Sequence, residues 1–360
     1  MRRLIAGALI FAACASPGMP PGGPPDVAAP EIIAIAPDSA RTGVSPKEVI
    51  FRFNEVVSER PPQYATLSDL FIISPREGTP QVSWERDEIA VRPRRGWRPN
   101  TAYTVTMLPG LSDIRGNVRN SGASTFFSTG GSLPRTRISG QVFDWVSGAA
   151  APGSLVEAFV APDTTHPYLA ITDTAGRFTM NHLPPGPYSL RAVVDKNKNR
   201  GLDPGEAWDS VTVVLADSAS PVLLAFVRDS IPPRILDVAV TDSLALLVRF
   251  DRPIDPAQTL TASNFSLAGA DSAAVPISLA PVQQADTSVR IAAQRRPSPS
   301  TQVSLVLRRP LVPGASYRMR GVDIRGLLGN SGTSERVFTT PAPPAIPAVP
   351  VPPPAIPIRR

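Results

Sequence analysis

In a twelve-residue segment in the middle of the chain, 195–206, five residues carry side-chain oxygen atoms. The residues concerned, with the glycine inside the segment, are Asp195, Asn197, Asn199, Gly201, Asp203 and Glu206. Counted from Asp195, the oxygens stand at loop positions 1, 3, 5, 9 and 12. Calcium takes about six to eight oxygen ligands, and calcium-binding loops supply them at this spacing. The segment is therefore a candidate calcium site.

The loop departs from that pattern in one important place. A glycine is expected at the sixth position, where Arg200 stands, and Gly201 follows it. Lys196, Lys198 and Arg200 also offset the charge of the three carboxylates. Two interpretations stay open: a weak calcium site of the kind found in extracellular modules, or a polar turn whose Asn and Asp side chains bond to their own backbone.

Few residues could support catalysis. His166 and His182 are the only histidines, and neither has a serine, cysteine or carboxylate at the spacing of a known catalytic motif. Phosphate-binding glycine loops and zinc-protease motifs are absent from the sequence. Glu55 and Glu59 lie four residues apart after a β-type segment, where solvated surface is the expected environment. The sequence therefore predicts a protein that is not an enzyme and has no cofactor, calcium excepted.

The only cysteine, Cys14, follows a short basic start and the apolar run Leu4–Ala13. That run has the length of a signal-peptide core and about half that of a membrane span. The residues from Phe11 to Cys14 resemble the bacterial lipobox, in which small residues precede a cysteine that is diacylated, although leucine is usual where Phe11 stands. The resemblance implies a signal peptide at 1–13 and lipidation of Cys14. The alternative is an incidental thiol in an ordinary signal peptide.

Composition and charge narrow the class of partner. The formal net charge is +6 over 360 residues, and 33 of the 36 basic residues are arginine. So small a net charge, combined with export, predicts no nucleic-acid partner. In the sorting pattern of lipobox proteins, Ala15 after the cysteine favours the outer membrane over the inner one.

Two proline-rich segments lie at the ends of the chain. We expect residues 14–28 to form a lipidated Pro/Gly-rich tether. The lipid is the one implied at Cys14, and the tether is expected because the segment shows no periodicity. Residues 341–360 hold nine prolines and predict a polyproline tail. The spacing of Pro344 and Pro347 could dock in an aromatic groove, with a stiff spacer as the alternative.

One pattern of residues occurs twice in the chain. Val49–Phe53 matches Leu246–Phe250, and a later alternating segment carries Tyr103 in one copy and Tyr317 in the other. Each tyrosine is followed by an Asp and Gly typical of turns, which are Asp113 with Gly116 and Asp323 with Gly326. Two copies of one domain, 29–130 and 232–340, therefore flank a different domain at 136–228.

All three segments predict β-structure. In the first copy Val49, Phe51 and Phe53 alternate with Ile50 and Arg52, and similar alternation predicts about seven short strands in that copy. The middle segment also contains about seven short β-rich runs. The predicted fold class is all-β, with three tandem β-sandwich domains between the tether and the tail.

At particular residues the first copy resembles the bacterial Ig-like domain of the SbsA-type surface-layer family. They are Pro30, Arg52–Asn54, Pro99–Tyr103 and Asp113–Asn117. The second copy departs from the family at Pro313–Ala315 and Leu327. The resemblance implies an extracytoplasmic Ig-like module without catalytic residues.

The middle domain resembles the carboxypeptidase-regulatory and collagen-adhesin B-repeat group, which has a transthyretin-like fold. The resemblance rests on Thr172–Phe178 and on Leu183–Leu190. Asp173, Gly176 and Gly186 are expected to form its turns.

Together these features predict a lipid-anchored, non-catalytic protein of the cell envelope, attached to a membrane and in contact with an envelope protein or polysaccharide. A carbohydrate- or matrix-binding adhesin is the alternative, and it could use aromatic stacking platforms. The candidate platforms, which could equally be buried core residues, are Trp84, Trp97, Trp145 and Trp208.

Overall fold

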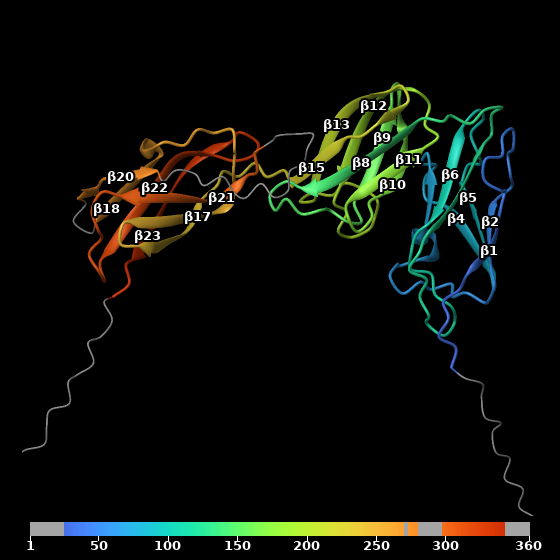
Figure 1. Ribbon diagram of the computed structural model, residues 1–360, viewed down its shortest axis with the longest axis horizontal. Helices are drawn as coiled ribbons and strands as arrows, with labels where there is room; N and C mark the ends of the chain where they lie inside the picture. Colours follow the sequence, from blue (N-terminus) through green and yellow to red (C-terminus); the bar gives the residue numbers. More distant parts are fainter. Residues whose placement is uncertain (1–24, 270–272, 280–296, 343–360) are drawn as a thin grey trace, which may run out of the picture.

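The computed structural model describes residues 25–269, 273–279 and 297–342, and its regular secondary structure there is almost entirely β-strand (Figure 1). Three units follow one another along the chain, each with its own buried core. The predicted signal peptide, Cys14, most of the tether and most of the Pro-rich tail lie outside the described residues. Within the described ranges, no helix is long and apolar enough to cross a membrane.

The first unit packs two antiparallel sheets against each other, with strand orders β1-β2-β5-β4 and β3-β6-β7. The strands are β1 (Ile32–Ala36), β2 (Val49–Phe53), β3 (Phe71–Ser74), β4 (Gln81–Glu85), β5 (Glu88–Arg92), β6 (Ala102–Met107) and β7 (Ala123–Ser128), with a short 3-10 helix, η1 (Leu67–Leu70). Alternation decides which side chains face the core, since Val49, Phe51 and Phe53 are buried while Arg52 is exposed. The predicted strands of this copy are thereby confirmed.

The second unit is a single connected sheet of eight strands that folds over one core. Its strands are β8 (Arg137–Asp144), β9 (Leu155–Val160), β10 (Asp163–Ile171), β11 (Arg177–Asn181), β12 (Gly186–Val193), β13 (Ala207–Leu215), β14 (Ser218–Ala219) and β15 (Val222–Val227). The main path runs β10-β9-β12-β13-β15-β8-β11, and β13 and β15 share only two residue pairs. Because residues from both ends of this path pack in the same core, the unit is a sandwich.

The third unit repeats the topology of the first. Its strands are β16 (Ile235–Asp242), β17 (Ala245–Ile254), β18 (Phe265–Gly269), β19 (Ala274–Val275), β20 (Ile277–Leu279), β21 (Ser300–Leu307), β22 (Ser316–Arg325) and β23 (Ser331–Thr339), with a second 3-10 helix, η2 (Ala262–Asn264). The sheet orders β16-β17-β21-β20 and β19-β18-β22-β23 match those of the first unit, with β19 added at one edge.

The repeat extends to individual hydrogen bonds. The amide of Arg98 donates to the hydroxyl of Tyr103, five residues later, at 2.8 Å. In the third unit the amide of Val312 donates to the hydroxyl of Tyr317 at 2.9 Å, with the same separation along the chain. The two tyrosines hold equivalent loop–strand corners, so the similarity of the two copies is structural and not only one of composition.

Candidate functional site at the junction of the first two units

The first and second units meet along an edge strand. β3 lies at the edge of its sheet and beside β10, and the apolar residues shared between the units are Ile72, Leu155 and Leu169. The amide of Leu169 also donates to Ser74 Oγ at 2.8 Å. An uncovered edge strand presents unpaired backbone groups to other chains. The second unit covers this one.

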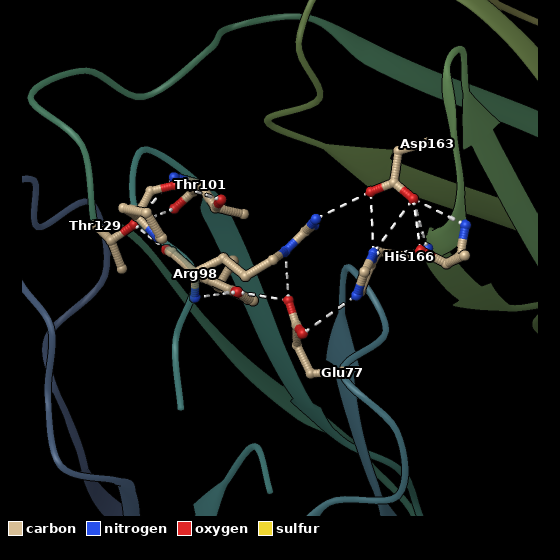
Figure 2. Close-up of polar contacts among 9 residues, drawn as sticks. Glu77, Arg98, Thr101, Thr129, Asp163 and His166 are labelled. Atoms are coloured by element: carbon tan, nitrogen blue, oxygen red, sulfur yellow. Dashed lines mark hydrogen bonds and ion pairs between the residues drawn. The ribbon is translucent and has the colours of Figure 1, made fainter. Parts of the chain in front are cut away.

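Charged side chains from both units lie next to the apolar contact. Figure 2 shows Arg98 between two carboxylates, with its Nε 2.7 Å from Glu77 Oε1 and its Nη1 3.0 Å from Asp163 Oδ2. His166 lies across from Arg98, with Nδ1 3.0 Å from Asp163 Oδ2 and Nε2 3.8 Å from Glu77 Oε2. The four side chains form a closed ring of contacts, two from each unit.

The backbone around Arg98 is itself held in place. Thr129 Oγ1 donates to the carbonyl of Arg98 at 2.6 Å and accepts the amide proton of Thr101 at 2.9 Å (Figure 2). The guanidinium therefore starts from a fixed loop, which lowers the entropy lost when the two domains dock.

Burial and hydrogen bonding change the acidity of this cluster. Burial raises the pKa of Tyr103, whose hydroxyl donates to Glu77 Oε1 at 2.7 Å. Burial also acts to raise the pKa of Asp163, but hydrogen bonds from Thr165 and Arg98 hold that pKa well below its usual value. Asp163 therefore stays ionised and supplies the negative charge that Arg98 meets across the junction.

A second ion-pair contact between the units involves Glu157, which is 1% exposed. Arg191 of the same unit donates to Glu157 Oε2 from Nε at 2.8 Å and from Nη2 at 2.5 Å. Arg76 of the first unit places Nη1 2.9 Å from Oε1, as an ion pair outside hydrogen-bond geometry. A buried carboxylate is costly unless it is paired, and a cation of the first unit adds to the pairing that the second unit supplies itself.

The loop 195–206 is the third part of the junction. Arg200 donates from Nη1 to the carbonyl of Phe71 at 2.6 Å and from Nη2 to the carbonyl of Asp69. The carbonyl of Arg200 in turn accepts a hydrogen bond from Arg76 Nη2 at 3.0 Å. The basic residue that the sequence places where a loop glycine was expected thus binds the neighbouring domain.

The backbone of the loop explains how an arginine can occupy that position. Arg200 has φ 60°, the left-handed conformation that a glycine usually supplies, and Lys198 has φ 59°. The amide of Arg200 donates to Asp195 Oδ2 at 2.8 Å, which supports this conformation. The turn geometry of the predicted loop is kept without the glycine.

The oxygen atoms of the loop accept hydrogen bonds from the loop itself. Asp203 Oδ2 accepts from the side-chain amides of Asn197 and Asn199, each at 2.7 Å. Glu206 accepts the amide protons of Lys196 and Asp203, each at 3.0 Å. A cation at the centre would require both asparagine amides to turn their oxygens inward. Calcium binding by this loop stays a prediction.

A different group of acids comes together at the other end of the first unit. Asp26, Glu55 and Asp113 bring oxygen atoms within 4.8 Å of one another, the one such group of three in the described part of the chain. Burial raises the pKa of Glu55, and the charges of Asp26 and Asp113 add to that effect. Sequence spacing could not reveal this group, because its members are far apart in the chain and Asp26 lies in the predicted tether.

The predicted turn residues occupy several kinds of position. Gly116, Gly176 and Gly186 have φ values of 93°, 71° and 148°, which residues with a side chain rarely adopt. In the third unit Asp323 instead lies within β22 with φ 52°, beside a register shift. The tight turn there closes from Gly326 to Gly329, whose amide donates to the Gly326 carbonyl at 2.9 Å.

The four tryptophans are half-buried and contact other parts of the chain. Trp97 packs edge-on against Tyr103 and Phe127, with ring centroids 4.9 and 5.0 Å away. The guanidinium carbon of Arg228 lies 3.8 Å above the ring of Trp208. These contacts occupy aromatic surface that a sugar would otherwise use.

Both histidines lie at the junction, which sequence reasoning did not anticipate. His182 stacks on Phe126 of the first unit with centroids 4.3 Å apart, and its Nδ1 lies 2.7 Å from the carbonyl oxygen of Pro134. His166 belongs to the ring of contacts with Arg98, Glu77 and Asp163. The only available signal was that both histidines stand next to probable turns, and that signal does not identify a domain contact.

The sequence was also compared with known families. Residues 26–129 match the family described as bacterial Ig-like domain, and residues 137–218 match the carboxypeptidase regulatory-like domain. The Ig-like domain and the regulatory-like domain correspond to the first and second units, and both resemblances inferred from sequence are thereby confirmed. No curated protein matches the sequence.

Several solved structures are similar to parts of the chain. The N-terminal part of the bacterial S-layer protein SbsC is 20% identical, over 31% of this chain and 24% of that one, with a TM-score of 0.23. BcpA, the major pilin subunit of Bacillus cereus, is 9% identical over 54% of this chain and 70% of that one, with a TM-score of 0.20. The Bacillus anthracis TIE protein is 11% identical over 89% of this chain and 56% of that one, with a TM-score of 0.19.

Replacing Arg76 with methionine should weaken the junction. The change keeps much of the side-chain volume but leaves Glu157 with one cation and removes the bond to Arg200. We expect the regulatory-like domain to lose about 1–3 kcal/mol of stability, and its unfolding to separate from that of the Ig-like domain in calorimetry of the full chain.

The matched control is Arg41→Met, which removes the exposed pair between Arg41 and Asp38 in the same domain. An exposed pair contributes about 0–1 kcal/mol, so this variant should melt nearly as the wild type does. Equal effects of the two substitutions would show that the junction charges carry no special weight.

Replacing Glu55 with glutamine should stabilise the Ig-like domain at neutral pH. The folded-state pKa of Glu55 is raised, so its ionised form costs stability above that pKa and its protonated form does not. We expect a gain of a few tenths of a kcal/mol near pH 7, fading as pH falls through the pKa of Glu55. Melting curves across pH, with Glu59→Gln as control, test this, and a gain that persists in acid would contradict it.

Calcium should stabilise the regulatory-like domain if the loop binds it. At a concentration ten times the dissociation constant, a ligand specific for the folded state adds about 1.4 kcal/mol, or a few degrees of melting temperature. We expect that shift between EDTA and millimolar Ca²⁺, and its loss in Asp203→Ala. Identical melting curves in the two buffers would show that hydrogen bonds alone hold the loop.

Proposed function

We propose that this protein is a lipid-anchored, non-catalytic spacer of the bacterial cell envelope, in which the Ig-like and regulatory-like domains act as one rigid piece. The observation that carries the proposal is the junction. Its buried apolar cluster, the ring of contacts around Arg98 and the docked loop around Arg200 join two domains into a single body. A rigid tandem keeps whatever it carries at a constant distance from its attachment point.

The environment of the histidines supports a non-catalytic role. His166 is engaged by Asp163 and Glu77, and His182 is stacked on Phe126. In the described part of the chain, the ring of His166 hydrogen-bonds with Thr165 and Asp163, that of His182 with the carbonyl of Pro134, and neither ring contacts a serine or cysteine. The resemblances to the two matched families imply structural and adhesion modules without catalytic residues, which also supports a non-catalytic role.

Attachment through Cys14 follows from the lipobox-like residues, and Ala15 favours the outer membrane. The first described residues of the chain lie against the Ig-like domain, since Asn117 Nδ2 donates to the carbonyl of Asp26 at 3.2 Å. Anchoring at the N-terminal side would therefore put the acidic end of the Ig-like domain, with Asp26 and Asp113, nearest the membrane.

A carbohydrate-binding adhesin that stacks sugars on tryptophan is less well supported. Trp97 packs in the aromatic core, and Arg228 covers Trp208. Stacking platforms need an open aromatic face.

The substitution Cys14→Ala should abolish anchoring. A bound acyl chain contributes about 0.8 kcal/mol per buried CH₂ group, so losing the acylated residue should move nearly all the protein from the membrane to the soluble fraction. Labelling with a palmitate analogue, followed by fractionation of the cell envelope, measures both incorporation and location. Wild-type protein that takes up no label, or a variant that stays in the membrane fraction, would refute the anchor.

A further inference from the structure

Four basic residues gather at the end of the Ig-like domain opposite Asp26 and Asp113. They are Lys47, Arg92, Arg94 and Arg95, called here the basic tip. Val49 pairs with Val91 between β2 and β5, so Lys47 and Arg92 lie at the same end of these strands. The carbonyl of Pro46, next to Lys47, accepts a hydrogen bond from Trp97 Nε1 at 2.6 Å, which brings the 92–97 segment against it.

The basic tip is built on a fixed turn. The amide of Gly96 donates to the carbonyl of Pro93 at 3.4 Å, and Gly96 has φ 81°, so Arg94 and Arg95 are the two central residues. Pro93 is buried on one side of the turn, and Trp97 packs into the aromatic core on the other. Both arginines are therefore held outward by anchors at each end.

These charges contribute no contact to the fold. All four side chains are exposed, and in the described ranges none of them has a hydrogen bond, ion pair or ring contact. Elsewhere in the same domain Arg52, Arg76 and Arg98 pair with carboxylates. Like charges without partners repel one another, and a bound anion would remove that repulsion.

We propose that the basic tip binds an anionic glycan of the cell envelope, through arginine contacts to its carboxylate or phosphate groups. Arginine forms paired hydrogen bonds with both groups. A protein partner would need apolar anchors, but the large exposed apolar residues described in this domain are Val27, Ile33 and Ile114, none of them in the segments that form the tip. A charged polymer needs only spaced cations on an accessible surface.

The proposal deepens the envelope function proposed above, because it gives the spacer a second point of attachment. It rests on that function only for the location of the glycan. If the N-terminal side is anchored to a membrane, the tip faces away from it, and the rigid domain would bridge membrane and polymer. Binding in solution does not depend on the anchor, so the two proposals fail independently.

The test compares the purified full-length chain with the double variant Arg94→Ser/Arg95→Ser. Binding is measured to polygalacturonate, to dextran phosphate and to neutral dextran over a range of salt concentrations. We expect binding to one or both charged glycans, none to neutral dextran, and at least tenfold weaker binding by the variant. The slope of log affinity against log salt should fall by about one for each arginine removed.

The matched control is Arg60→Ser/Arg115→Ser, which removes two exposed arginines from the same domain and changes the net charge equally. This control should bind nearly as the wild type does, and melting curves of both variants should overlay the wild type. Preference for the carboxylate or the phosphate polymer identifies the group recognised. Equal loss in the control, unchanged binding in the variant, or tighter binding to polyaspartate than to either glycan would overturn the proposal.

Discussion

The arrangement of the first two domains depends on one buried carboxylate. Glu157 lies inside the regulatory-like domain, with Arg191 from its own sheet and Arg76 from the Ig-like domain as partners. Removing a carboxylate from water costs several kcal/mol, which favourable pairing must offset. Because Arg76 also donates to the carbonyl of Arg200, the same side chain positions the docked loop. The neutralisation of Glu157 and the orientation of the two domains therefore depend on the same side chain, that of Arg76.

The connection between the first and second units differs in kind from that between the second and third. The first combines apolar burial at Ile72 and Leu169 with several charge-assisted contacts. At the second, the segment leading into the third unit is held by the ion pair of Asp229 with Arg252 Nε, at 2.5 Å and with partly exposed side chains. Exposed ion pairs contribute little to stability. The junction of the first two units is consequently the one that makes a rigid body.

The first and third units share a topology but not their contacts with neighbouring domains. Tyr103 and Tyr317 hold equivalent corners, but the residue that binds the tyrosine hydroxyl is Arg98 in one copy and Val312 in the other. Arg98 reaches Asp163 of the regulatory-like domain, whereas Val312 is 63% exposed. At this shared corner the first copy has an arginine that contacts the neighbouring domain, and the third unit has an exposed valine.

The sequence alone determined the fold class, the strands, the repeat and the two matched domain types. Alternation of residues such as Phe51 and Arg52, and turn residues such as Gly176, act within a few positions of each other, so they can be read along the chain. Only the tertiary structure decided that His166 meets Glu77, that Arg200 binds the backbone of another domain, and that Asp26 joins Glu55 and Asp113. These groups are brought together by the packing of distant segments, and no local spacing encodes that packing.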